Sequence, residues 1–178
     1  TGARLNVGVI SAGDYFLPRV LVEFAGRNKG VMLNLTVHNR AELLARISEN
    51  QTDLAVMVRP PTDMDTVAQP FAPHPYVIVA PPQHPLIGRR RIPVPRIMKE
   101  PFVVREKGSD TFHAMEEAFG EHLPLLHAAM EIRSTETIKQ AVIAGMGLGF
   151  LSAHTLGLEL QTGSLAVLDV QGFPLMRN

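Results

Sequence analysis

Apolar residues in this chain fall into short runs, and most runs are followed by a stretch in which apolar positions recur at helical spacing. The run at 5–10 is followed by Leu17, Val20, Leu21 and Phe24, an i, i+3, i+4, i+7 stripe that predicts a helix over 14–27 with this stripe in the core. Residues 31–37 alternate as a strand, and Asn39 opens a helix that carries Leu43 and Ile47. Strands that feed helices in this order predict an α/β fold with parallel sheets.

The same unit recurs twice in the second half of the chain. Residues 101–105 form an apolar strand, followed by a helix with Phe112, Met115 and Phe119 on one face. Residues 130–132 lead into a helix that ends on Gly145, Gly147 and Gly149, where a positive φ costs least, and a strand at 148–151 follows.

A proline-rich segment divides the chain. The buried strand predicted at 53–58 ends in Arg59-Pro60-Pro61, and the composition of 60–75 is typical of a linker that crosses between two lobes. We expect a return crossover near 152–158, after which a helix at 153–161 and a strand at 165–170 rejoin the first part. The predicted division is therefore 1–72 with 158–178 as lobe I, and 73–157 as lobe II.

Three helix starts carry hydroxyl side chains directly after strands, at Ser11, at Ser109 and at Ser134-Thr135. Helix N-termini present free backbone N–H groups, which suits a small anionic ligand. The simpler interpretation is N-capping, worth roughly 1 kcal/mol at each position. Because the pattern recurs at three strand ends, we expect Ser11, Ser109 and Thr135 to line one ligand site.

Three further residues are candidates for that site. Arg59 and Arg105 each follow a strand, where a guanidinium can bind a carboxylate or phosphate through two hydrogen bonds. The alternative for both arginines is a salt bridge between lobes. Asn39 is a candidate pocket residue, with capping of the second helix as its alternative role.

Composition narrows the function classes. The chain has 178 residues, 46% of them hydrophobic, a net charge of +0 and no cysteine. This balance provides no basic surface for nucleic acid, and the dispersed histidines do not form a zinc motif. We find no nucleophile with a base beside it, so we expect no catalytic residue, no metal and no cofactor other than a small-molecule effector. No apolar run reaches the roughly 20 residues of a membrane span.

Motifs along the whole chain resemble the effector-binding domain of LysR-type transcriptional regulators. They are Leu-x-Val-Gly-Val-Ile-Ser at 5–11, Tyr-Phe-Leu-Pro at 15–18, Asp-Leu-Ala-Val at 53–56, His-Pro-Leu at 84–86, Gly108-Ser109 and Gly-x-Gly-x-Gly-Phe-Leu at 145–151. Further details resemble the CbbR-type regulators of carbon-fixation operons, among them Arg89-Arg90-Arg91-Ile92-Pro93 and Ile-Lys-Gln-Ala-Val at 138–142.

The resemblance implies two Rossmann-like lobes joined by two crossovers, as in type II periplasmic binding proteins. It implies an effector in the interlobe cleft, here a small anionic metabolite, with phosphorylated metabolites among the candidates. It also implies a cytoplasmic homodimer or homotetramer that contacts DNA only through an N-terminal winged helix-turn-helix, which this sequence does not include. The alternative is a periplasmic solute-binding protein for a small anionic solute, which has the same fold.

Overall fold

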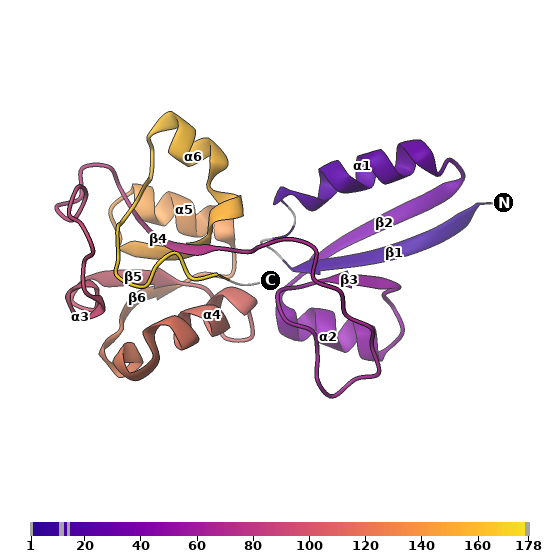
Figure 1. The fold of residues 1–178 in the computed structure, drawn as a ribbon, viewed down its shortest axis with the longest axis horizontal. Coiled ribbons are helices and arrows are strands. Elements are labelled where there is room, and N and C mark those ends of the chain that lie inside the picture. The colour runs from indigo at the N-terminus through magenta and orange to yellow at the C-terminus, as the bar shows by residue number, and fades with distance from the viewer. Residues whose placement is uncertain (1, 11–12, 14, 177–178) are drawn as a thin grey trace. The chain divides into compact units, whose positions relative to one another are not determined.

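The computed structural model describes residues 2–10, 13 and 15–176. The chain divides into two compact units, one comprising the residues up to Phe71 (unit 1) and the other those from Ala72 onward (unit 2). Each unit is built on its own sheet (Figure 1). Among the described residues, no helix is long and apolar enough to cross a membrane.

Unit 1 is a three-stranded parallel sheet in the order β2-β1-β3, with α1 and α2 on opposite faces (Figure 1). Its parallel pairing confirms the expectation from the strand-helix pattern. Its elements are β1 (Ala3–Ile10), α1 (Leu17–Arg27), β2 (Val31–His38), α2 (Arg40–Ser48) and β3 (Leu54–Val56).

The apolar stripe on α1 was expected to lie in the core, and this expectation is only partly correct. Leu17 is buried against Val7 and Val9 of β1, with Leu21 packed beside it. Val20 is 53% exposed and Phe24 37% exposed. Part of the apolar stripe on α1 therefore faces outward rather than into the unit 1 core.

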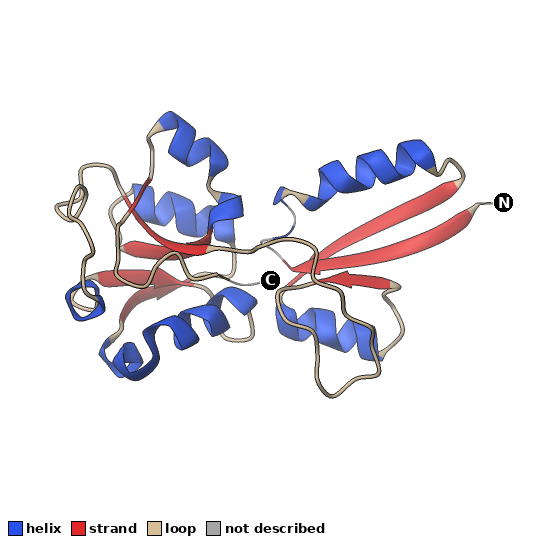
Figure 2. Ribbon diagram, in the orientation of Figure 1, coloured by secondary structure: helices blue, strands red, loops and turns tan. Residues whose placement is uncertain are grey.

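Unit 2 contains a five-stranded mixed sheet in the order β6-β5-β7-β4-β8 (Figure 2). Strands β6, β5 and β7 are parallel, whereas β4 runs antiparallel to both β7 and β8. Its elements are β4 (Tyr76–Ala80), α3 (Val94–Ile97), β5 (Pro101–Val104), α4 (Asp110–Phe119), the 3-10 helix η2 (Gly120–Leu125), β6 (His127–Glu131), α5 (Thr135–Ile143), β7 (Leu148–Ser152), the 3-10 helix η3 (Ala153–Thr155), α6 (Gly157–Thr162) and β8 (Ala166–Val167).

Alternation along the central strands of unit 2 creates two cores, one on each face of the sheet. Phe102 and Phe150 pack against Met115 and Phe119 of α4 on one face. Val103 of β5 packs with Ile138 and Val142 of α5 on the other face, in a second cluster. The strands are therefore buried on both sides, as expected of sheets covered by helices.

The end of the chain does not follow the predicted division. We expected residues 158–178 to belong to lobe I, but 158–176 pack within unit 2. Strand β8 pairs with β4, and Leu175 exchanges two backbone hydrogen bonds with Tyr76. The first boundary lies between Phe71 and Ala72, one residue before the predicted position. The strand predicted at 165–170 is observed only as β8 (Ala166–Val167), the two residues that pair with β4.

Two glycines after α5 serve different purposes. Gly145 has a φ of +92°, as expected at the end of a helix. At Gly147 a Cβ would lie 2.6 Å from the Pro101 carbonyl oxygen, so glycine is required there by the close approach of two backbones.

Candidate functional site

Arg105 lies at the end of β5, and its guanidinium is 3% exposed. Nε donates to Oε1 of Glu106 at 2.7 Å, and Nη2 donates to Oε2 of the same carboxylate at 3.3 Å. Nη1 donates to the hydroxyl of Thr135 at 3.2 Å. The guanidinium therefore joins the loop after β5 to the first residue of α5, within unit 2.

Ser109 occupies the N-cap of α4 and uses its hydroxyl twice. Its Oγ accepts the Phe112 amide at 2.9 Å and donates to the Glu106 carbonyl at 2.9 Å. Ser134 caps α5 in the same manner by accepting the Thr137 amide at 3.2 Å. Both helices thus keep first-turn N–H groups outside the intrahelical pattern.

The predicted site residues of unit 2 are brought together through Glu106. Arg105 and Thr135 are hydrogen-bonded to each other, and Ser109 is bonded to the main chain of Glu106. Glu106 itself was absent from the prediction, although an acid directly after a strand-end arginine was a signal for it. Its side chain is 6% exposed, so the pair is a buried one.

In unit 1, Asn39 caps α2 by accepting the Glu42 amide at 2.9 Å, which matches the alternative role considered for it. Arg59 is half-buried and lies three residues after the end of β3. Nη1 of Arg40 donates to the carbonyl of Arg59 at 2.6 Å and so fixes the backbone there. Ser11 lies outside the described residues.

The charge balance at the unit 2 residues limits what they can bind alone. Arg105 contributes one positive charge, whereas buried Glu106 and buried Asp110 contribute two negative charges. Arg105, the helix amides and the Thr135 hydroxyl can donate to ligand oxygens, but a strongly anionic group needs positive charge from elsewhere.

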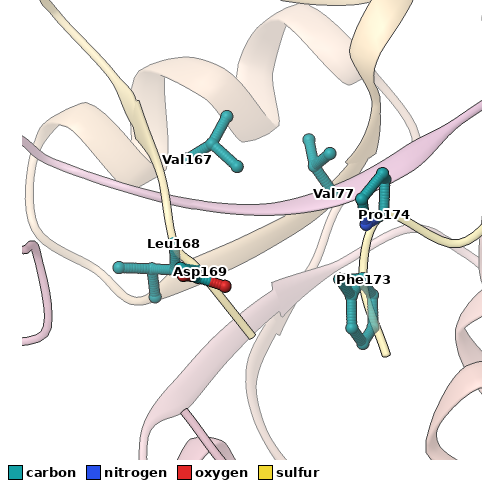
Figure 3. A pocket seen from close by; sticks show the side chains of 6 residues that line it. All are labelled: Val77, Val167, Leu168, Asp169, Phe173 and Pro174. Carbon is teal, nitrogen blue, oxygen red and sulfur yellow. The ribbon is translucent and has the colours of Figure 1, made fainter. Parts of the chain in front are cut away.

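No group of three or more His, Asp or Glu residues in the described part of the chain could hold a metal ion. A separate hollow of about 230 Å³ lies in unit 2 between β4, β8 and the C-terminal segment (Figure 3). None of the predicted site residues lines it. The lining is mainly apolar and consists of Val77, Val167, Leu168, Asp169, Phe173 and Pro174.

The model for the LysR substrate binding domain matches residues 1–178. The chain belongs to this LysR family. The transcriptional regulator CfxR of Cupriavidus necator is 44% identical over 173 residues, which are 97% of this chain and 55% of that protein. CbbR of Sinorhizobium medicae is 46% identical over 98% of this chain and 56% of its own length. The resemblance to CbbR-type regulators is thereby confirmed.

Among solved structures, the regulatory domain of CcmR from Synechocystis PCC6803 in complex with 2-PG matches with a TM-score of 0.93. The two sequences are 38% identical, and the match covers 98% of this chain and 84% of the other. The two-lobed, type II periplasmic-binding-protein-like fold class is confirmed by such neighbours. This LysR chain spans about half the length of the curated relatives it matches. Both of those relatives are named as transcriptional regulators, and neither name states a catalytic activity.

His74 lies where the LysR chain enters unit 2, and it is buried there. Its ring is 5.0 Å from that of Tyr76 and 5.3 Å from that of His154, and its Nε2 has no hydrogen-bond partner among the described residues. His154 in turn donates from Nε2 to the Pro73 carbonyl at 2.9 Å. Burial, and secondarily the positive charge on His154, lower the pKa of His74 to about 4.

This pKa predicts that stability falls in acid. Between pH 6.5 and 4, His74 is protonated in the unfolded chain but not in the folded chain. The free energy of unfolding therefore falls by about 3 kcal/mol as the pH falls through this window. Urea unfolding at pH 7.5, 6 and 5 measures the loss. In His74→Phe the free energy of unfolding should change less steeply with pH. His127→Gln, at an exposed position, is the control. An unchanged slope in the His74 variant would contradict the assignment.

Proposed function

We propose that this chain is the sensor of a transcriptional regulator and binds a small anion that carries phosphate, carboxylate or both. The observation that carries the proposal is the cluster of Arg105, Ser109 and Thr135 in a chain so similar to a regulatory domain solved with 2-PG. Arg59 would supply the further positive charge, and Ser11 and Asn39 remain predicted members of the same site. Contact with DNA would come from a separate winged helix-turn-helix, which fits the net charge of +0 in this chain.

The proposal includes self-association in the cytoplasm, where a transcriptional regulator acts. Two helices display apolar side chains outward. Val22 on α1 is 73% exposed, and Leu158 on α6 is 67% exposed. Exposed apolar surface of this kind is typical of interfaces, and a second copy of the chain would cover it. Sedimentation of the chain and of a Val22→Glu variant measures the association.

Calorimetric titration with 2-phosphoglycolate, the compound abbreviated 2-PG above, tests the binding. We expect Arg59→Ala to weaken binding at least tenfold, because a hydrogen bond to a charged group contributes about 1.5–3 kcal/mol. Thr135→Val keeps the side-chain shape, removes the hydroxyl and should also weaken binding.

Arg90→Ala, at an exposed arginine, is the matched control and should bind as the unaltered chain does. Glycolate and inorganic phosphate, titrated separately, show which end of the ligand is recognised. Equal affinity of the Arg59 and Arg90 variants would refute the role of Arg59. Absence of binding by the unaltered chain would refute this ligand class.

A further inference from the structure

Lys139 is a buried cation in the middle of α5 that the proposed ligand site does not use. It is 2% exposed, although it lies next to Ile138 in a helix face that otherwise packs apolar side chains. Its Nζ donates to the Thr155 carbonyl at 2.7 Å and lies 2.8 Å from Glu136 Oε1 and 3.1 Å from Glu159 Oε1. An ammonium has three donors, so these contacts account for all of them.

The partners of Lys139 belong to three different elements of unit 2. Glu136 lies on α5 itself, Thr155 ends η3, and Glu159 lies on α6. Glu159 is 8% exposed, whereas its neighbours Leu158 and Leu160 are 67% and 41% exposed. The inward carboxylate therefore fixes the orientation in which α6 presents its outward leucines.

The same helix carries Thr135 one turn before Lys139. Residues at i and i+4 lie on one side of a helix, so the hydroxyl bonded to Arg105 and the ammonium bonded to Glu159 are fixed to one rigid element. A displacement of α5 at its N-terminus would carry Lys139 with it. The ion pair would then pull on α6, since buried pairs tolerate little stretching.

We propose that Lys139 is a positioning residue that makes α6 move with α5, so that a ligand at the N-terminus of α5 changes the position of α6 within unit 2. The inference rests on the proposed function. It adds to it a physical link between the ligand residues at the start of α5 and a helix that contributes none of them.

Hydrogen exchange of the chain with and without 2-phosphoglycolate tests the link. In the unaltered chain the ligand should slow exchange in both α5 and α6. In Lys139→Met it should slow exchange in α5 alone, and Lys139→Arg, which keeps the charge and donors, should restore the response in α6. Lys99→Met, at an exposed lysine, is the matched control. Slowing of α6 in Lys139→Met equal to that in the unaltered chain would overturn the proposal.

Two further variants keep the test independent of folding and of the ligand. Glu159→Gln retains Lys139 with its other two partners and should also uncouple α6. Thr135→Ala perturbs α5 without any ligand and should change exchange in α6 only when Lys139 is present. If 2-phosphoglycolate changes exchange nowhere, the ligand class proposed above is wrong, and the Thr135→Ala comparison alone decides the link. An equal response of α6 in both backgrounds then overturns it.

Discussion

Replacing Lys139 with methionine lowers the free energy of unfolding by about 3–5 kcal/mol, the loss expected when one partner of a buried ion pair is removed. Methionine fills a similar volume, so the loss comes from charge and hydrogen bonding. Glu159 would keep its charge at 8% exposure, and the Thr155 carbonyl would lose its donor. Urea unfolding followed by circular dichroism measures the difference.

The double variant Lys139→Met with Glu159→Leu separates the two contributions. It removes both charges and should recover much of the loss, because replacing a buried pair with apolar side chains is often neutral or stabilising. Lys99→Met should unfold within about 0.5 kcal/mol of the unaltered chain. If the single and double variants are equally destabilised, the loss at position 139 comes from packing and the pair has no electrostatic role.

The starts of α2, α4 and α5 were predictable, whereas α1, expected over 14–27, begins at Leu17 without a side-chain cap. Asn39, Ser109 and Ser134 each accept the amide three residues later, at the positions where the sequence places them after strands. Capping depends on neighbours within one turn, so a single sequence contains the information it needs. The apolar strand predicted at 101–105 is likewise observed, as β5 over Pro101–Val104.

Long-range pairing was less predictable. The assignment of 158–178 to lobe I failed because hydrophobic pattern does not reveal which strand β8 will join. The expectation of parallel sheets overlooked the antiparallel direction of β4 for the same reason. The exposure of Val20 and Phe24 was missed because an apolar stripe shows which side chains are hydrophobic, and not how many of them the sheet beneath α1 covers.

In the candidate site, too, the sequence predicted individual residues but not the contacts between them. Arg105 and Thr135 were predicted separately, and their hydrogen bond follows from the adjacency of β5 and β6, whose carboxyl ends lead to both residues. Glu106 was missed because the sequence reasoning treated it as part of a turn, whereas burial makes it the counter-ion of its neighbour. Lys139 belonged to a motif of the resemblance, yet only the fold brings Glu159 to it, twenty residues away.

Replacing Arg105 with methionine should destabilise the chain by about 3–5 kcal/mol, because Glu106 would remain buried without its counter-ion. The change also removes the donor that holds the Thr135 hydroxyl, so α5 would lose its tie to the loop after β5. We therefore expect two effects, a lower urea midpoint and a weaker affinity for 2-phosphoglycolate measured by calorimetry.

The second substitution Glu106→Gln, added to Arg105→Met, distinguishes these effects. Neutralising the carboxylate removes the uncompensated charge, so stability should recover in part while affinity stays low, since the ligand still lacks the guanidinium and the positioned hydroxyl. Arg90→Met is the control for loss of a surface charge. Recovery of affinity together with stability would mean that Arg105 only supports the fold, whereas stability restored without affinity would place its guanidinium in the recognition of the anion.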